Sequence, residues 1–141
     1  MITYLDTSTL IKLLIHEPGS EQATRIWDAA DRLVSVGLVE VEARAALAAA
    51  ERSNRLTTAE HRRAKASLTA HLDQVNIVEV DAHLITAASE LAEREGLRGY
   101  DAVHLAAALV VGVDALTSAD ADLCSAAARR GLSVANPIDE G

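Results

Sequence analysis

Residues 2–15 read ITYLDTSTLIKLLI, and the hydrophobic pattern of this stretch changes at Asp6. The four residues before Asp6 form a short apolar run of the kind that buried strands contain. After Asp6, the residues Leu10, Ile11 and Leu14 recur at the spacing of one helical face, and a Pro-Gly pair then ends the segment. The chain therefore begins with a strand, an acidic residue and a helix, in that order.

The rest of the sequence repeats this alternation of short strands and helices. Further strands are predicted at residues 33–36, 75–80, 113–117 and 132–135. Helices are predicted at residues 7–15, 21–30, 38–52, 58–72, 82–95, 100–111 and 120–130, with Ser20, Thr57 and Asp81 suited to cap three of them. Because parallel strands need crossover connections, we expect an α/β fold with a mostly parallel sheet and helices on both faces.

The composition indicates one domain without a membrane anchor. At 141 residues the chain is close to the commonest domain size of about 100 to 150 residues, so we expect residues 1–141 to form a single domain. The longest apolar stretch, residues 102–113, is shorter than the ~20 residues that span a bilayer, and the N-terminus has no secretion-signal pattern. We therefore expect a cytoplasmic protein, which agrees with a single cysteine, Cys124, that cannot form an internal disulfide.

The charge is acidic overall but unevenly distributed. The formal charge of −8 argues against a protein that coats nucleic acid, because such binding depends on basic side chains that neutralise phosphates. Residues 44–65 nevertheless contain six basic residues and two acidic ones. The six are Arg44, Arg52, Arg55, Arg62, Arg63 and Lys65. This segment is either a local basic face or an ordinary solvated helical surface.

Two aspartates are placed where parallel sheets bind ligands, beyond the carboxyl ends of the strands. Asp6 directly follows the first strand, and Asp120 lies three residues after the fourth. Both can therefore point into one crevice. Each also stands at the start of a helix, where an aspartate often serves only as an N-cap.

Two further acids are predicted to face inward from helices. Glu42 lies on the apolar side of helix 38–52 together with Leu38, Ala45, Ala46 and Ala49, so its carboxyl group needs a partner. The alternative is a buried salt bridge or a protonated carboxyl. Asp101 opens the next inward-facing helix on the same side as His104. Asp101 could instead complement the helix dipole, and His104 is more simply explained as a hydrogen-bonded core residue than as a ligand.

The four acids together suggest a metal centre. Two carboxylates 4 Å apart repel each other by about 4 kcal/mol at an effective dielectric constant of 20, and a divalent cation removes that cost. Oxygen ligands suit Mg²⁺ or Mn²⁺, and the absence of a Cys/His set argues against zinc. Such a metal can activate water against a phosphate ester. The predicted chemistry is hydrolysis of a phosphodiester.

The acidic motifs resemble those of the PIN-domain nucleases, in particular the VapC-type toxins of bacterial toxin–antitoxin pairs. The similarity covers the chain from Leu5 to Pro137 in the same order and spacing. The matching motifs are Leu5-Asp6-Thr7-Ser8, Glu42 within EARAAL, Tyr100-Asp101-Ala102-Val103-His104-Leu105-Ala106, and Ser118-Ala119-Asp120-Ala121-Asp122-Leu123. The third motif is the most specific of them.

This resemblance implies a three-layer α/β/α sandwich and a Mg²⁺- or Mn²⁺-dependent endoribonuclease. It also implies restraint by a cognate VapB-like antitoxin and a homodimeric state. The catalytic and metal-binding acids would be Asp6, Glu42, Asp101 and Asp120, with Asp122 as a further candidate ligand. Ser8 and Ser118 would contact the substrate by orienting water or phosphate.

Other interpretations differ in their sequence requirements. A haloacid-dehalogenase-type phosphatase would carry a second aspartate where this chain has Ser8. A receiver domain would need paired early acids and a late lysine, whereas the only lysines of this chain are Lys12 and Lys65. Neither a GxGxxG nor a P-loop motif is present. A non-catalytic, protein-binding scaffold and a nuclease acting on DNA or on RNA ends remain open. Because the chain has few aromatic residues, we expect RNA to be selected by shape and backbone position.

Overall fold

A computed structural model describes residues 1–139, so the last two residues of the predicted domain lie outside the described part. Five strands form one sheet, and every neighbouring pair in it is parallel. The strands are β1 (Ile2–Leu5), β2 (Arg32–Val36), β3 (Asn76–Val78), β4 (Ala115–Thr117) and β5 (Ser133–Ala135). Their order across the sheet is β3-β2-β1-β4-β5, which confirms the predicted α/β fold with a parallel sheet.

Seven helices connect these strands within the described residues. They are α1 (Thr7–Leu14), α2 (Ser20–Ala29), α3 (Leu38–Arg52), α4 (Thr58–Leu72), α5 (Ala82–Glu95), α6 (Gly99–Val111) and α7 (Ala121–Arg129). Each predicted strand and helix is present, and the differences lie at the ends. β3 is shorter than predicted because only residues 76–78 pair with β2, and Val80 is exposed beyond the ladder.

The prediction that Ser20 caps α2 was wrong by one residue. Gly19 is the N-cap and has a positive φ of 92°, which side chains rarely adopt. A Cβ atom on Gly19 would lie 2.9 Å from the backbone oxygen of Pro137. Ser20 is instead the first helical residue, and its hydroxyl accepts a hydrogen bond from the backbone N–H of Glu17 at 2.9 Å.

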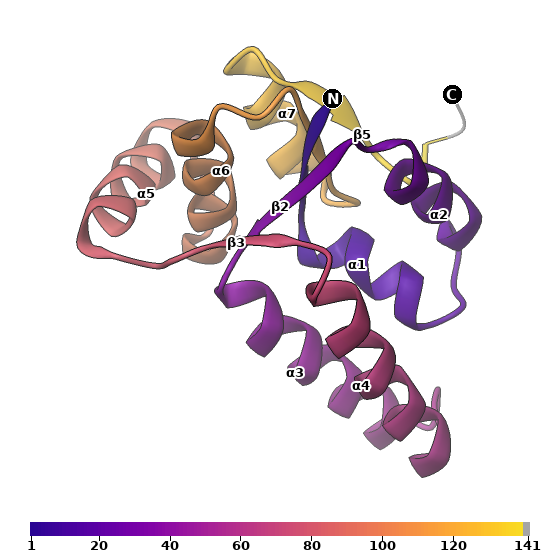
Figure 1. The fold of residues 1–141 in the computed structure, drawn as a ribbon. Coiled ribbons are helices and arrows are strands. Elements are labelled where there is room, and N and C mark those ends of the chain that lie inside the picture. The colour runs from indigo at the N-terminus through magenta and orange to yellow at the C-terminus, as the bar shows by residue number, and fades with distance from the viewer. Residues whose placement is uncertain (140–141) are drawn as a thin grey trace.

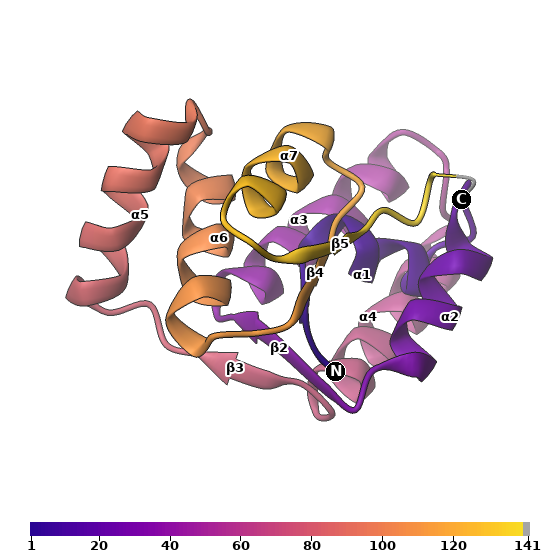
Figure 2. The same cartoon turned by 90° about the horizontal axis from the view of Figure 1, so that it is seen from above.

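Helices cover both faces of the sheet, as predicted (Figures 1 and 2). α5 and α6 lie side by side in both views, and their apolar residues share one core cluster with α7 and with Tyr4, Val34 and Leu116 of the sheet. On the other face, Leu5 and Leu33 pack against residues of α1, α3 and α4. Successive strand residues point to opposite faces, so Tyr4 and Leu5 serve the two cores separately.

α3 and α4 form a pair that extends away from the sheet (Figure 1). Thr57 caps α4 as predicted and forms a capping box: the Thr57 hydroxyl accepts from the Glu60 N–H, and the Glu60 carboxylate accepts from the Thr57 N–H. The helices meet through small and aliphatic side chains, which are Leu47, Ala50, Ala64 and the partly buried Leu56.

The strand order places the candidate site at a switch in chain direction. From β1 the chain moves outward to β2 and β3, then crosses to the other side of β1 to form β4 and β5. In parallel sheets such a switch leaves a crevice at the strand carboxyl ends, where ligands bind. Asp6 stands at this point, and its backbone N–H donates to the Thr117 carbonyl at the end of β4, at 3.0 Å. In the described residues no helix is long and apolar enough to cross a membrane.

Candidate metal centre

Asp6 is held by two hydroxyl groups. It occupies the N-cap position of α1, but its side chain makes no capping hydrogen bond, and the residue is only 5% exposed. Its Oδ2 instead accepts hydrogen bonds from Ser8 Oγ at 2.6 Å and from Ser118 Oγ at 2.7 Å. The carboxylate is therefore aimed toward the carboxyl ends of β1 and β4 and is not used as a helix cap.

The two serines tie this carboxylate to the loop after β4. Ser8 Oγ accepts from the Ala119 N–H at 2.9 Å, and Ser118 Oγ accepts from the Asp120 N–H at 3.0 Å. Ser118 is fully buried. The structure thus gives both hydroxyls a part in positioning Asp6, while their contact with substrate stays a prediction.

Glu42 and Asp6 both contact the same histidine, His104. Its Oε1 is 2.6 Å from His104 Nε2 and accepts a hydrogen bond from Thr7 Oγ1 at 2.9 Å. The same His104 nitrogen is 3.4 Å from Asp6 Oδ1. The expected apolar side of α3 was shifted: the buried residues are Val39, Ala43, Leu47 and Ala50, and Glu42 lies at their edge with its side chain 27% exposed.

His104 is fully buried and links several groups of the centre. This agrees with the interpretation of His104 as a hydrogen-bonded core residue. Its Nδ1 is 2.8 Å from the Tyr4 hydroxyl, and the two rings meet edge to face. Burial alone would lower the pKa of His104, but the hydrogen bond to Glu42 and the charge of Asp6 outweigh it and raise the pKa. For Glu42, burial alone would raise the pKa. The hydrogen bond and the charge of His104 outweigh this effect, so the pKa of Glu42 is lowered. Both effects favour the charged pair.

Asp101 and Asp120 form the second pair of acids, and Arg98 joins them. Arg98 Nε donates to Asp101 Oδ2 at 3.2 Å, and Nη2 of the same guanidinium donates to Asp120 Oδ2 at 3.1 Å. Burial and the charge of Asp120 raise the pKa of Asp101, although Arg98 opposes them. Asp120 also caps α7, since its Oδ1 accepts from the N–H groups of Asp122 and Leu123. The position of Asp120 therefore fits both the interpretation as an N-cap and the interpretation as an acid of the site.

Asp122, the further candidate, is exposed in the first turn of α7. Its backbone N–H donates to Asp120 Oδ1 at 2.9 Å. Its part in a metal site remains a prediction.

The side chains present fit a hard divalent cation in chemistry. All four acids offer carboxylate oxygens, and the hydroxyl groups beside Asp6 are also oxygen donors. Within residues 1–139 no three His, Cys, Asp or Glu side chains already converge as a closed metal cage. Instead, positive groups lie between the acids: His104 between Asp6 and Glu42, and Arg98 between Asp101 and Asp120.

Sequence reasoning missed Arg98, Thr7 and Tyr4 in this centre. The position of Arg98 three residues before Asp101 is a helical neighbour spacing and could have suggested the contact. No local pattern links Tyr4 or Thr7 to His104, because these contacts join residues about a hundred positions apart.

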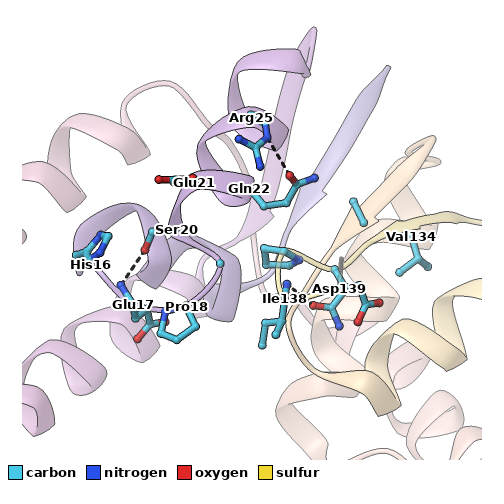
Figure 3. A pocket seen from close by; sticks show the side chains of 14 residues that line it. His16, Glu17, Pro18, Ser20, Glu21, Gln22, Arg25, Val134, Ile138 and Asp139 are labelled. Carbon is cyan, nitrogen blue, oxygen red and sulfur yellow. Dashed lines mark hydrogen bonds between the residues drawn. The ribbon is translucent and has the colours of Figure 1, made fainter. Parts of the chain in front are cut away.

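A large hollow of about 1230 Å³ lies between the α1–α2 turn and the C-terminal segment (Figure 3). His16 and Arg25 line it together with the acidic Glu17, Glu21 and Asp139. None of the four candidate acids is among its lining residues. The acidic centre is therefore defined by its side-chain contacts and not by the size of a cavity.

The fold and this acidic centre define a class of protein that comparison with known families identifies. Residues 3–129 match the model of the PIN domain, and the chain belongs to the PIN-domain family, in its VapC branch. One relative is Ribonuclease VapC45 of Mycobacterium tuberculosis, which is 42% identical over 111 residues, or 79% of this chain and 77% of that protein.

Solved structures show the same fold at low sequence identity. The M. tuberculosis toxin VapC20, described as cleaving the sarcin-ricin loop, superposes with a TM-score of 0.70 at 21% identity, covering 92% of this chain and 95% of that one. A toxin–antitoxin complex from Klebsiella pneumoniae gives a TM-score of 0.66 at 18% identity, covering 96% and 97%. These similarities confirm the three-layer α/β/α architecture.

Proposed function

We propose that this protein is a Mg²⁺- or Mn²⁺-dependent endoribonuclease and the toxin of a toxin–antitoxin pair. The observation that carries the proposal is the arrangement of Asp6, Glu42, Asp101 and Asp120 around the switch point of a parallel sheet. Two of these acids are held by hydrogen bonds, Asp6 to Ser118 and Glu42 to His104. The family membership and the relative named as a ribonuclease support the same activity.

Different residues of the chain would have different roles in such a site. Asp6, Glu42, Asp101 and Asp120 would hold the cation, which when bound supplies Lewis acidity and an activated water for phosphodiester hydrolysis. Ser8 and Ser118 keep the Asp6 carboxylate in one orientation through two short hydrogen bonds. Outer hydrogen bonds of this kind orient metal ligands in many proteins.

The Glu42 carboxylate is kept ionised by its neighbours. His104 and Thr7 both donate to the same oxygen atom, Oε1, which leaves Oε2 for a cation or a water molecule. The lowered pKa of Glu42 keeps the carboxylate ionised to a lower pH than an ordinary glutamate. Glu42 is therefore suited to bind a cation.

The proposed partners follow from the family and its neighbours. We propose RNA as the substrate, a VapB-like antitoxin as the inhibitor and a homodimer as the working form. A neighbour of the same fold that is described as a toxin–antitoxin complex supports the antitoxin. The cytoplasmic location also stays a prediction.

The test of this function is cleavage of RNA and single-stranded DNA panels by purified, antitoxin-free protein in Mg²⁺, Mn²⁺ or EDTA. Glu42→Gln and Glu40→Gln form a matched pair, because both change one acid of α3 and only Glu42 touches the centre. We expect internal cuts in RNA that need metal and are lost in Glu42→Gln, Asp6→Asn and Asp101→Asn but kept in Glu40→Gln. Equal cleavage by all variants, or cleavage in EDTA, would contradict the proposal.

The non-catalytic scaffold is the second candidate, and one observation favours it. Arg98 and His104 each lie between two of the four acids and offset part of their negative charge, so part of the repulsion is removed without a metal. A scaffold predicts that folded wild-type protein neither binds Mn²⁺ nor cleaves any RNA of the panel. Metal-dependent cleavage lost with Asp6→Asn would exclude it.

A further inference from the structure

Arg98 stands directly before α6 and reaches back over the acidic centre. It is the N-cap residue of that helix, with an extended backbone, and its side chain is 80% exposed. The carboxylates that it contacts are much less exposed, at 15% for Asp101 and 25% for Asp120. A solvent-exposed cation thus bridges two largely buried anions from the outside.

The oxygen atoms that Arg98 occupies are ones that a metal would need. Both contacts use Oδ2, and the other oxygen of Asp120 is already engaged in capping α7. Within residues 1–139 no other basic group lies within ion-pair distance of either acid. A cation bound between Asp101 and Asp120 and the guanidinium of Arg98 therefore exclude each other at these atoms.

His104 differs from Arg98 in how tightly its side chain is held. Its side chain is only 1% exposed and is fixed at both nitrogens, by Tyr4 and by Glu42. It cannot leave without opening the core. Arg98 has no such packing and can swing into solvent, where a long side chain regains rotamer freedom.

We infer that Arg98 is a displaceable internal counter-ion, which competes with the divalent cation for Asp101 and Asp120 and so raises the metal concentration that the centre requires. This inference rests on the proposed metal site. In the metal-free protein Arg98 holds the two acids together against their mutual repulsion. When metal binds, Arg98 is released to the rim of the site.

The test is calorimetric titration of Mn²⁺ into the purified, antitoxin-free full chain and its variants. Arg98→Gln removes the charge and keeps a side chain able to hydrogen bond, and Arg98→Lys keeps a point charge without the planar fork. Arg94→Gln is the matched control, because Arg94 is an exposed arginine of α5 that makes no ion pair within the described residues. All three comparisons use the metal alone as the probe.

We expect Arg98→Gln to bind Mn²⁺ about fivefold more tightly than wild type, Arg98→Lys to lie between them, and Arg94→Gln to match wild type. In EDTA, Arg98→Gln should also melt below Arg94→Gln, and saturating Mn²⁺ should remove that difference. Unchanged or weaker Mn²⁺ binding by Arg98→Gln would overturn the inference, since an arginine that helps to hold the metal gives that result.

The same titration separates this inference from the proposed function. If wild type binds Mn²⁺ and Asp101→Asn does not, the metal site stands, and only the behaviour of Arg98→Gln decides the role of Arg98. If neither wild type nor any variant binds Mn²⁺, both the metal site and the competition are wrong.

Discussion

His104 joins more groups of the centre than any other single side chain described above. Its two ring nitrogens contact Tyr4 and Glu42, and it is completely buried. Replacing it with an apolar residue would remove the partner of the buried Tyr4 hydroxyl and leave the Glu42 carboxylate with Thr7 alone. A buried polar group left unsatisfied costs about 1 to 3 kcal/mol, and more when it is charged.

We therefore expect His104→Leu to lower the free energy of unfolding by about 2 to 4 kcal/mol in urea denaturation. Tyr4→Phe removes only the outer hydrogen bond and should cost about 1 kcal/mol. The double variant should cost less than the sum of the two, because Tyr4→Phe removes one of the groups that His104→Leu strands. Strict additivity would mean that the two residues do not act through one hydrogen bond.

Ser118 offers a second test at the scale of one residue. Its hydroxyl donates to Asp6 and accepts from the Asp120 N–H, so Ser118→Ala frees one proposed ligand and loosens the loop that carries another. We expect Mn²⁺ affinity to fall about tenfold, as for other outer hydrogen bonds to metal ligands. Ser125→Ala, an exposed serine of α7, is the control and should bind as wild type does. Equal affinities in the two variants would show that Asp6 is positioned without Ser118.

Among the helices and strands, the features that the sequence predicted correctly depend on residues close together in the chain. The helix caps at Thr57 and Asp81 both depend on residues within one turn of each other. The ends of β3 and β4 were less accurate, because where pairing stops depends on neighbouring strands distant in sequence. That Glu42 needs a partner could be predicted, but the partner, His104, could not, since 62 residues separate them.

The capping box gives a prediction for α4. Thr57→Ala removes the acceptor of the Glu60 N–H and should destabilise the protein by about 1 kcal/mol in chemical denaturation. Thr58→Ala is the control, because Thr58 is an exposed first residue of the helix and should change stability by less than about 0.5 kcal/mol. If both variants are equally stable, the end of α4 frays in solution and the cap contributes nothing.

For the whole molecule, the distribution of charge bears on how an acidic protein could hold RNA. Residues 44–65 carry an excess of basic side chains, and all six are exposed. On α3, however, Arg44 follows Glu42 by two residues, which places it on nearly the opposite side of the helix. Arg44 therefore points away from Glu42, and within the described residues none of the six basic side chains forms an ion pair with a candidate acid. We expect them to contact a part of an RNA that lies beyond the cleaved bond.

This separation predicts a difference between binding and chemistry. A triple Gln variant of Arg62, Arg63 and Lys65 removes three exposed charges of α4, so RNA binding should weaken at low salt. The slope of log affinity against log salt should fall by up to about 2, at roughly 0.7 per phosphate contact on single strands. Cleavage of a bound RNA in single turnover should stay unchanged, because the hydrogen-bond partners of Glu42 are Thr7 and His104 and include none of these three residues. The control replaces Arg25 and Arg94, two exposed basic residues outside this segment, and should keep the wild-type slope. An unchanged slope in the triple variant would mean that the α3–α4 surface is solvated and that RNA is held elsewhere.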